Sequence, residues 1–153
     1  PAGLIYRRVT AVSAQFSGIF RWFRAMKQIV FAVHSGQFKV LLAMTFWQRL
    51  KGLLGTRRLP AEQGLLLPGC SGIHMFGMRY PLDIIYLDRD GKILKVVAEL
   101  QPWQISGCLQ AAAVLEVGSG TAARQGWQAG VRLEHLGYDA HKHAVEIKIE
   151  QRI

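Results

Sequence analysis

The chain consists of short apolar runs separated by glycine, proline and charged turn residues. Apolar runs of this length, bounded by turn signals, are typical of β-strands rather than helices. The clearest turn is Asp88-Arg89-Asp90-Gly91, which predicts a hairpin because Gly91 can adopt a positive φ. The pattern predicts strands over residues 29–33, 38–42, 65–67, 73–78, 82–87, 93–98, 113–117 and 131–133.

Two short helices are predicted among these strands. Thr45 is a favourable N-cap for a helix over Phe46–Leu54, which Gly55 ends. The apolar side chains of this helix form one arc, and Arg49 lies at its edge. A second helical turn is predicted over Thr121–Gln125. The sequence therefore predicts a mainly β (α+β) fold: a small barrel-like or folded mixed sheet with one or two short helices.

The length of the chain and the distribution of its charges predict that it consists of three parts. The 153 residues have room for one domain, which we place at residues 26–137. Residues 1–25 contain four arginines and no acidic residue, and Met26 is a natural start, so we expect a basic N-terminal extension outside the fold. Residues 138–153 alternate apolar and polar side chains, which predicts a strand-like C-terminal extension.

The net charge, the length of the apolar runs and the number of cysteines indicate where the protein resides and what it could contact. A net charge of +9 favours contact with nucleic acid or anionic surfaces, but no nucleic-acid motif accompanies it. The apolar runs are too short for a transmembrane helix or an export signal, so we expect a cytoplasmic protein. The two cysteines, Cys70 and Cys108, fit a reducing compartment. Residues 1–25 could also lie on a membrane surface as a basic amphipathic helix.

The segment from Cys70 to Asp83 holds the highest density of side chains that could carry chemistry. In a strand over 73–78, His74, Phe76 and Met78 would share one face, so we expect His74 to be partly buried or to line a pocket. Cys70 and His74 supply fewer ligands than the three or four that zinc requires. We therefore expect no metal site and no cofactor.

Asp83 shares its predicted strand face with Ile85 and Leu87, which places its carboxylate toward the core. A buried carboxylate needs a partner to keep its charge, and a structural role is favoured over a catalytic one. Glu116, between Leu115 and Val117, raises the same question. The candidate partners of Asp83 are Arg49, Arg79 and His74, of which Arg49 is favoured because it borders the apolar arc.

Several motifs in this order resemble one family. They begin with residues 47–55 (WQRLKGLLG) and 64–67 (GLLL), continue with 70–91 (CSGIHMFGMRYPLDIIYLDRDG), and end with 100–103 (LQPW) and 114–118 (VLEVG). From about residue 38 to 136 the chain resembles the uncharacterised bacterial and archaeal family called domain of unknown function 192. The resemblance implies a compact, mainly β domain with a short helix. It implies no established activity, cofactor or catalytic residue, and it directs attention to His74, Met78 and Asp83 as a pocket.

The favoured hypothesis is a non-enzymatic binding or accessory module for a small molecule or a protein. Its predicted pocket is formed by Cys70, His74, Met78, Arg79, Asp83 and Arg49. The first alternative is a hydrolase that uses Cys70, His74 and Asp83, with or without a metal ion. The second alternative, nucleic-acid or anionic-surface binding, rests on charge and would require basic side chains on one face, namely Arg57, Arg58, Lys92 and Lys95.

Overall fold

The computed structural model describes residues 27–33, 36–45, 48, 52–133, 138–139 and 144–145. The prediction for residues 1–25 lies outside these residues, as does most of the predicted helix over 46–54. The start of that helix is described: the Thr45 hydroxyl accepts the Gln48 amide at 3.1 Å, while the Gln48 side chain accepts the Thr45 amide at 3.0 Å. This reciprocal pair is a capping box, so the N-cap prediction at Thr45 is confirmed.

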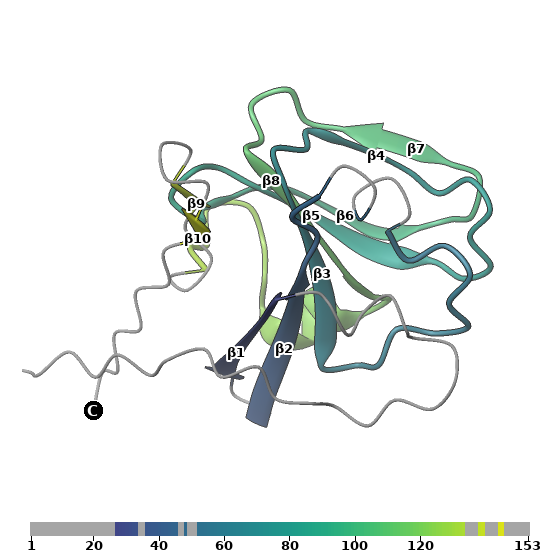
Figure 1. Cartoon of the computed structure of the whole chain (residues 1–153), viewed down its shortest axis with the longest axis horizontal. Helices are drawn as coiled ribbons and strands as arrows, with labels where there is room; N and C mark the ends of the chain where they lie inside the picture. Colours follow the sequence, from purple (N-terminus) through teal and green to yellow (C-terminus); the bar gives the residue numbers. More distant parts are fainter. Residues whose placement is uncertain are drawn as a thin grey trace, which may run out of the picture.

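Nearly half of the described residues belong to β-strands (Figure 1). α2 (Thr121–Gln125) is the one helix that the structure describes over more than a single residue. The strands are β1 (Lys27–Val33), β2 (Gly36–Leu42), β3 (Gln63–Pro68), β4 (Gly72–His74), β5 (Leu82–Leu87), β6 (Ile93–Leu100), β7 (Ile105–Gly107), β8 (Ala113–Gly118), β9 (Tyr138–Asp139) and β10 (Ala144–Val145).

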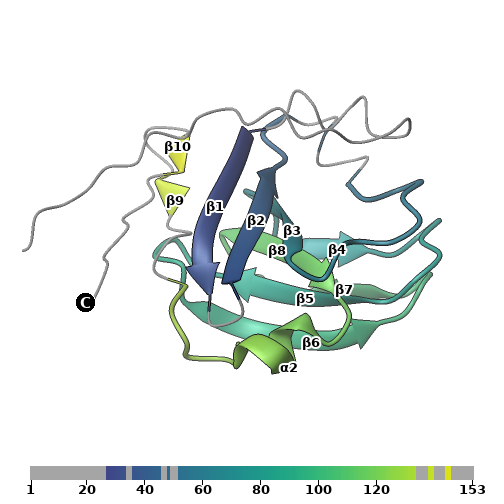
Figure 2. The ribbon, with the colours of Figure 1, turned by 90° about the horizontal axis from the view of Figure 1, so that it is seen from below.

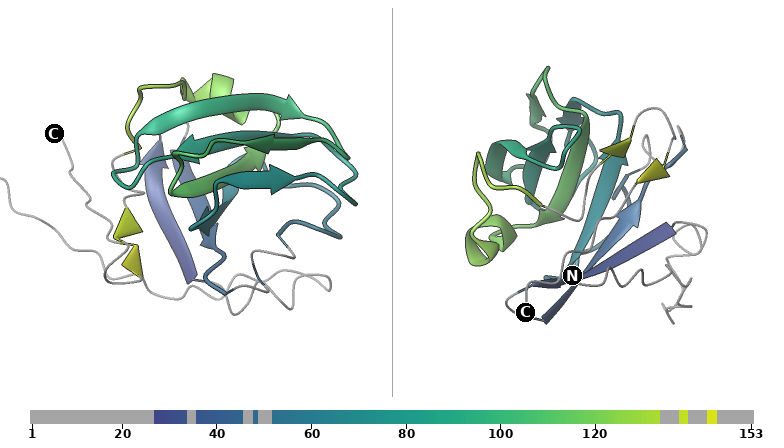
Figure 3. Two further views of the ribbon diagram at one scale, coloured as in Figure 1. Left: turned by 90° about the horizontal axis from the view of Figure 1, so that it is seen from above. Right: turned by 90° about the vertical axis from the view of Figure 1, so that its left-hand side faces the viewer.

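Six strands form one mixed sheet in the order β1-β2-β3-β8-β5-β6. β2 and β3 are parallel, and the other neighbours are antiparallel. The sheet bends strongly, so that β1 and β2 run steeply across β5 and β6 (Figure 3). Its outer strands β1 and β6 do not pair with each other in the described part of the chain. The predicted folded mixed sheet is therefore confirmed, and it does not close into a barrel.

Both faces of this sheet are buried. Along β5, Ile85 and Leu87 point to one face, whereas Ile84 and Tyr86 point to the other. The first face, here called the helix side, packs against α2 (Figure 2). Trp127 packs on the same face, and its ring lies 5.3 Å from that of Phe38. The second face packs against the small sheet β4–β7 and is called the flap side.

The strand predictions fail mainly next to β4. β3, β5, β8 and α2 form where predicted, but the strand expected over 73–78 ends at His74. The next four residues form a turn, closed by the Met78 amide on the Met75 carbonyl at 3.1 Å, with Gly77 at φ 78°. The run 131–133 contributes only a single bridge from Arg132 to Lys92 rather than a strand.

Candidate binding surface

The structure does not gather the predicted pocket residues in one place. Met78 is buried and Cys70 half-buried on the flap side, whereas Asp83 binds the start of α2 on the helix side. His74 is exposed, contrary to the expectation that it would be partly buried, and Arg79 is exposed as well. The sheet therefore separates Asp83 from Cys70 and His74. The hydrolase hypothesis required these three side chains to meet.

Asp83 is buried as predicted, with 1% of its surface exposed, but its partners are backbone amides. Its Oδ1 accepts the Glu99 N–H at 2.9 Å, and its Oδ2 accepts the Ala122 N–H at 2.9 Å. Neither of the described candidates, Arg79 or His74, binds it. Arg49, the favoured partner, lies outside the described residues.

The backbone explains why an acidic side chain is needed at Asp83. Opposite it, β6 contains one extra residue, because Leu82 pairs with Leu100 while Ile84 pairs with Val97. Such a bulge leaves an amide without a ladder partner, and Asp83 accepts the amide of Glu99 in this bulge. The other accepted amide belongs to the first turn of α2, where helices lack internal acceptors. Asp83 thus satisfies two donors that the fold leaves unpaired.

A row of exposed rings lies at the end of the β4–β7 sheet. The His74 and Phe76 rings stack with centroids 5.1 Å apart at 25°, and the Phe76 and Trp103 rings are 6.1 Å apart at 33°. Ile105 pairs with His74 across the two strands. Phe76 is 48% exposed, and Trp103 and Ile105 are each 69% exposed. We call these four side chains the aromatic row. Exposed apolar clusters of this kind mark interaction sites in soluble proteins.

Two neighbouring turns hold the aromatic row. Phe76 lies in the turn Met75–Met78, and Trp103 lies in a second turn that the Gln104 amide closes on the Gln101 carbonyl at 3.2 Å. The Met75 carbonyl accepts both the Met78 amide at 3.1 Å and the Trp103 amide at 2.9 Å. Main-chain hydrogen bonds therefore fix the two turns relative to each other.

Trp103 occupies a backbone conformation that its residue type rarely adopts. Pro102 precedes it at the second position of the turn, and Trp103 at the third has a φ of 70°. Positive φ at this position defines a type II turn and normally selects glycine or asparagine. A side chain in this region costs on the order of 1 kcal/mol, and such strain concentrates at functional sites. Tryptophan at this position therefore carries a conformational cost that glycine would avoid.

This strain can be measured by comparing two substitutions that both remove the indole. We expect the free energy of unfolding of Trp103→Gly to exceed that of Trp103→Ala by about 1 kcal/mol, because only glycine relieves the positive φ. The glycine variant should therefore unfold at a higher urea concentration. Urea denaturation of both variants gives the difference directly. An alanine variant as stable as the glycine variant would show that Trp103 is not strained.

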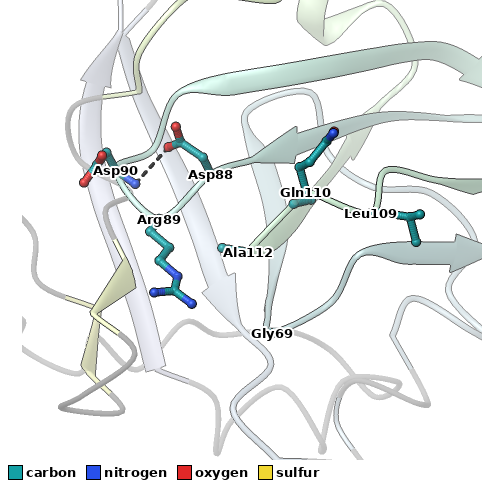
Figure 4. Close-up of a pocket in the computed structure, with 8 residues that line it drawn as sticks. Gly69, Asp88, Arg89, Asp90, Leu109, Gln110 and Ala112 are labelled. Carbon is teal, nitrogen blue, oxygen red and sulfur yellow. Dashed lines mark hydrogen bonds between the residues drawn. The ribbon is translucent and has the colours of Figure 1, made fainter.

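A shallow hollow with a volume of about 520 Å³ lies elsewhere, beside the hairpin turn that joins β5 and β6 (Figure 4). Its lining includes none of the predicted pocket residues. The Asp88 carboxylate at its edge already accepts the amides of Asp90 and Lys92 at 2.8 and 2.9 Å, which stabilises the turn. Gly91 follows at φ 78°, as the hairpin prediction required. The hollow is lined by Gly69, Asp88, Arg89, Asp90, Leu109, Gln110, Ala111 and Ala112.

The flap side buries several polar groups. Burial raises the pKa of Glu116 from 4.5 to about 8, and its Oε2 has no hydrogen-bond partner among the described residues. Burial also raises the pKa of Tyr80, which bonds to Thr56, and of Tyr86. The Tyr86 hydroxyl makes no hydrogen bond of normal geometry with another described residue. Glu116 and Tyr86 are closed off from solvent, whereas Tyr80 is partly exposed.

Neither a metal site nor a membrane-spanning helix is found among the described residues. No group of three or more His, Cys, Asp or Glu side chains in this part of the chain could hold a metal ion. In the same residues, no helix has both the length and the apolar character needed to cross a bilayer.

The fold and this surface can now be compared with known proteins. The chain belongs to the family DUF192, described as an uncharacterized ACR, whose model matches residues 29–135. This confirms the resemblance read from the motifs. No curated protein matches the sequence.

Two solved structures are similar to this chain. The first is a "putative transcription regulator" from Sinorhizobium meliloti 1021, with 28% identity over 71% of this chain and 92% of that one, and a TM-score of 0.61. The second is a protein of unknown function from Novosphingobium aromaticivorans DSM 12444, with 27% identity over 70% of this chain and 83% of that one, and a TM-score of 0.59.

Sequence reasoning missed the main members of the aromatic row. Phe76 was expected on a strand, and Trp103 carried no pattern that marked it as exposed. One signal was available: Pro102 predicts a turn, and a tryptophan directly after a turn proline is seldom buried in a strand. The exposure of Ile105 depends on β7, which is too short to be recognised from alternation.

Proposed function

We propose that this domain is a non-enzymatic binding module whose contact surface is the aromatic row of His74, Phe76, Trp103 and Ile105. The observation that carries the proposal is Trp103, which is 69% exposed at a φ of 70°. A residue free of functional constraint at this turn position would be expected to be glycine or asparagine. Tryptophan is also the side chain that most often dominates the energy of an interface.

The arrangement of the row supports binding rather than catalysis. Main-chain hydrogen bonds fix the two turns that carry Phe76 and Trp103, so little backbone ordering is needed when a ligand binds. Asp83, the acidic member of the alternative hydrolase site, serves backbone amides on the other side of the sheet. The description of the Sinorhizobium protein as a "putative transcription regulator" names no reaction, although it suits a nucleic-acid-binding module as well as a protein-binding one.

Nucleic-acid binding is less favoured because, among the described residues, no Lys or Arg side chain lies over a ring of the row. In the described part of the chain, the cation that lies over an aromatic ring is Lys95, whose Nζ is 5.7 Å from the centroid of the Tyr86 ring. Neither residue belongs to the row. The Lys95 ammonium group also donates a hydrogen bond to the Gly107 carbonyl at 3.0 Å, so it already has a partner within the domain.

Fragment mapping tests the proposed function. Small uncharged ring compounds such as phenol and indole, titrated into ¹⁵N-labelled protein, should shift the resonances of Phe76, Trp103 and Ile105 more than those of other residues. Leu109→Ser is the matched control, because Leu109 is an apolar side chain that is 96% exposed outside the row. This variant should retain the shifts, whereas Trp103→Gly should lose them. Fragments that gather instead at the hollow beside Asp88 would contradict the proposal.

A further inference from the structure

The chain has two cysteines, and the fold brings both to one end of the β4–β7 sheet. Cys70 lies just before β4 and Cys108 directly follows β7, at the end of the sheet opposite His74 and Ile105. Both are thiols in this structure. We propose that Cys70 and Cys108 form a reversible disulfide bond and thereby make this end of the sheet a site of redox modification. The bond would form whether or not the aromatic row binds a ligand.

Main-chain hydrogen bonds hold Cys70 against the turn that follows β7. The Ser71 carbonyl accepts the Cys108 amide at 2.8 Å, and the Gly69 amide donates to the Ala112 carbonyl at 2.8 Å. Both neighbours of Cys70 are therefore bonded to this turn, one at each of its ends. Because paired strands lie about 4.8 Å apart and each residue rises about 3.4 Å, the Cα atoms of Cys70 and Cys108 should be about 6 Å apart. A disulfide bond spans Cα separations of roughly 4.4 to 6.8 Å, so the backbone can accommodate one here.

The side chains of the two cysteines lie on the same side of the β4–β7 sheet. In a regular ladder, residues one position out of register point to opposite faces. The ladder ends here, because Gly69 has a φ of 74° and the Ala111 amide closes a turn on the Cys108 carbonyl at 2.9 Å. Both cysteines accordingly pack against the apolar cluster of the flap side. Burial raises the pKa of Tyr86 in this cluster, and the nearby Cys108 thiol raises it further.

The oxidant is a small disulfide such as oxidised glutathione, which can reach the half-buried cysteines. One cysteine, as the thiolate, attacks a glutathione sulfur, so that a mixed disulfide forms and one glutathione leaves. The other cysteine, as the thiolate, attacks the protein sulfur of the mixed disulfide and releases the second glutathione. The two protein thiols thus lose two electrons and two protons, and one glutathione disulfide becomes two thiols. In reducing surroundings such a bond is transient and serves to sense oxidants.

The test is to incubate the folded, reduced full chain with oxidised glutathione and to measure its intact mass. We expect the monomer to lose about 2 Da, the mass of two hydrogen atoms, and proteolysis to yield peptides joined through Cys70 and Cys108. Dithiothreitol should reverse the change. Cys70→Ser and Cys108→Ser are matched controls, and each should retain one glutathione because the thiol that would release it is missing. The oxidised wild type should also unfold at a higher urea concentration than the reduced form, because the bond keeps residues 70–108 in a closed loop after unfolding.

Several results would overturn the proposed disulfide. Wild-type protein that retains two glutathiones, or whose mass does not change, would show that the two sulfurs cannot meet in the folded domain. Disulfide-linked dimers in place of the cross-linked monomer would show that the thiols react between molecules rather than within one. An oxidised monomer that unfolds at a lower urea concentration than the reduced form would show that the bond distorts the fold. Ring fragments that still shift Phe76 and Trp103 in any of these cases would leave the proposed binding function intact.

Discussion

Replacing Glu116 with glutamine is expected to abolish a steep loss of stability between about pH 5 and about pH 8. Burial raises the pKa of Glu116 from 4.5 to about 8, so the folded protein keeps its proton over a range in which the unfolded chain has released it. The folded state therefore binds more protons than the unfolded state, and its stability falls as the pH rises through this window. The loss amounts to roughly 3 to 4 kcal/mol, because each pKa unit corresponds to about 1.4 kcal/mol.

Urea denaturation of wild type and Glu116→Gln at several pH values measures this effect as a difference, which removes the contribution of other groups. The neighbouring tyrosines do not interfere, because burial raises the pKa of both Tyr80 and Tyr86 above the ordinary value of 10.0. Glu62→Gln is the control, because Glu62 is exposed and should keep the wild-type pH dependence. The same pH slope in Glu116→Gln as in wild type would show that the carboxyl group is not responsible.

The second large effect is expected at Asp83, where substitution by asparagine should cost about 3 kcal/mol of stability. Both carboxylate oxygens accept backbone amides, from Glu99 and from Ala122. Asparagine retains one acceptor but turns an NH₂ group toward the second amide, so one buried donor loses its partner. The loss should be measured by urea denaturation at neutral pH, where the carboxylate acts as acceptor twice.

Asp88→Asn provides a matched control for this experiment. Asp88 also accepts two backbone amides, but both bond to the single oxygen Oδ1, so asparagine can preserve them. Its stability should change by less than about 0.5 kcal/mol. If Asp83→Asn unfolds like wild type and instead loses ligand binding, Asp83 belongs to the functional site and the structural role assigned to it is wrong.

The parts of the fold that could be predicted are those in which the local pattern and the burial agree. β5 is buried at every position and forms over the predicted residues, as does α2, which begins after Gly120 and ends at Gly126. The strand expected over 73–78 failed because Gly77 adopts a positive φ and turns the chain after β4. A glycine inside an apolar run is compatible with both a strand and a turn, and only the tertiary structure decides between them.

The candidate site was less predictable because it depends on pairs of residues distant in sequence. The burial of Asp83 followed from its strand face, but its partners arise from a bulge in β6 and from the start of α2, neither of which strand periodicity detects. Phe76 and Trp103 come from separate turns, which the backbone of Met75 joins by hydrogen bonds to Trp103 and Gln104. Sequence reasoning therefore singled out the segment around His74 but did not predict the surface that this segment forms with Trp103.

The shared acceptor at Met75 has a consequence for how this family can diversify. Because main-chain bonds hold both turns, the side chains of Phe76 and Trp103 contribute little to folding and can be exchanged at small cost. If the row is the proposed binding surface, a few substitutions at two turn tips would alter its ligand preference while the sheet beneath stays unchanged. The same property makes this domain a suitable scaffold for libraries in which residues 76, 103 and 105 are randomised to select new binders.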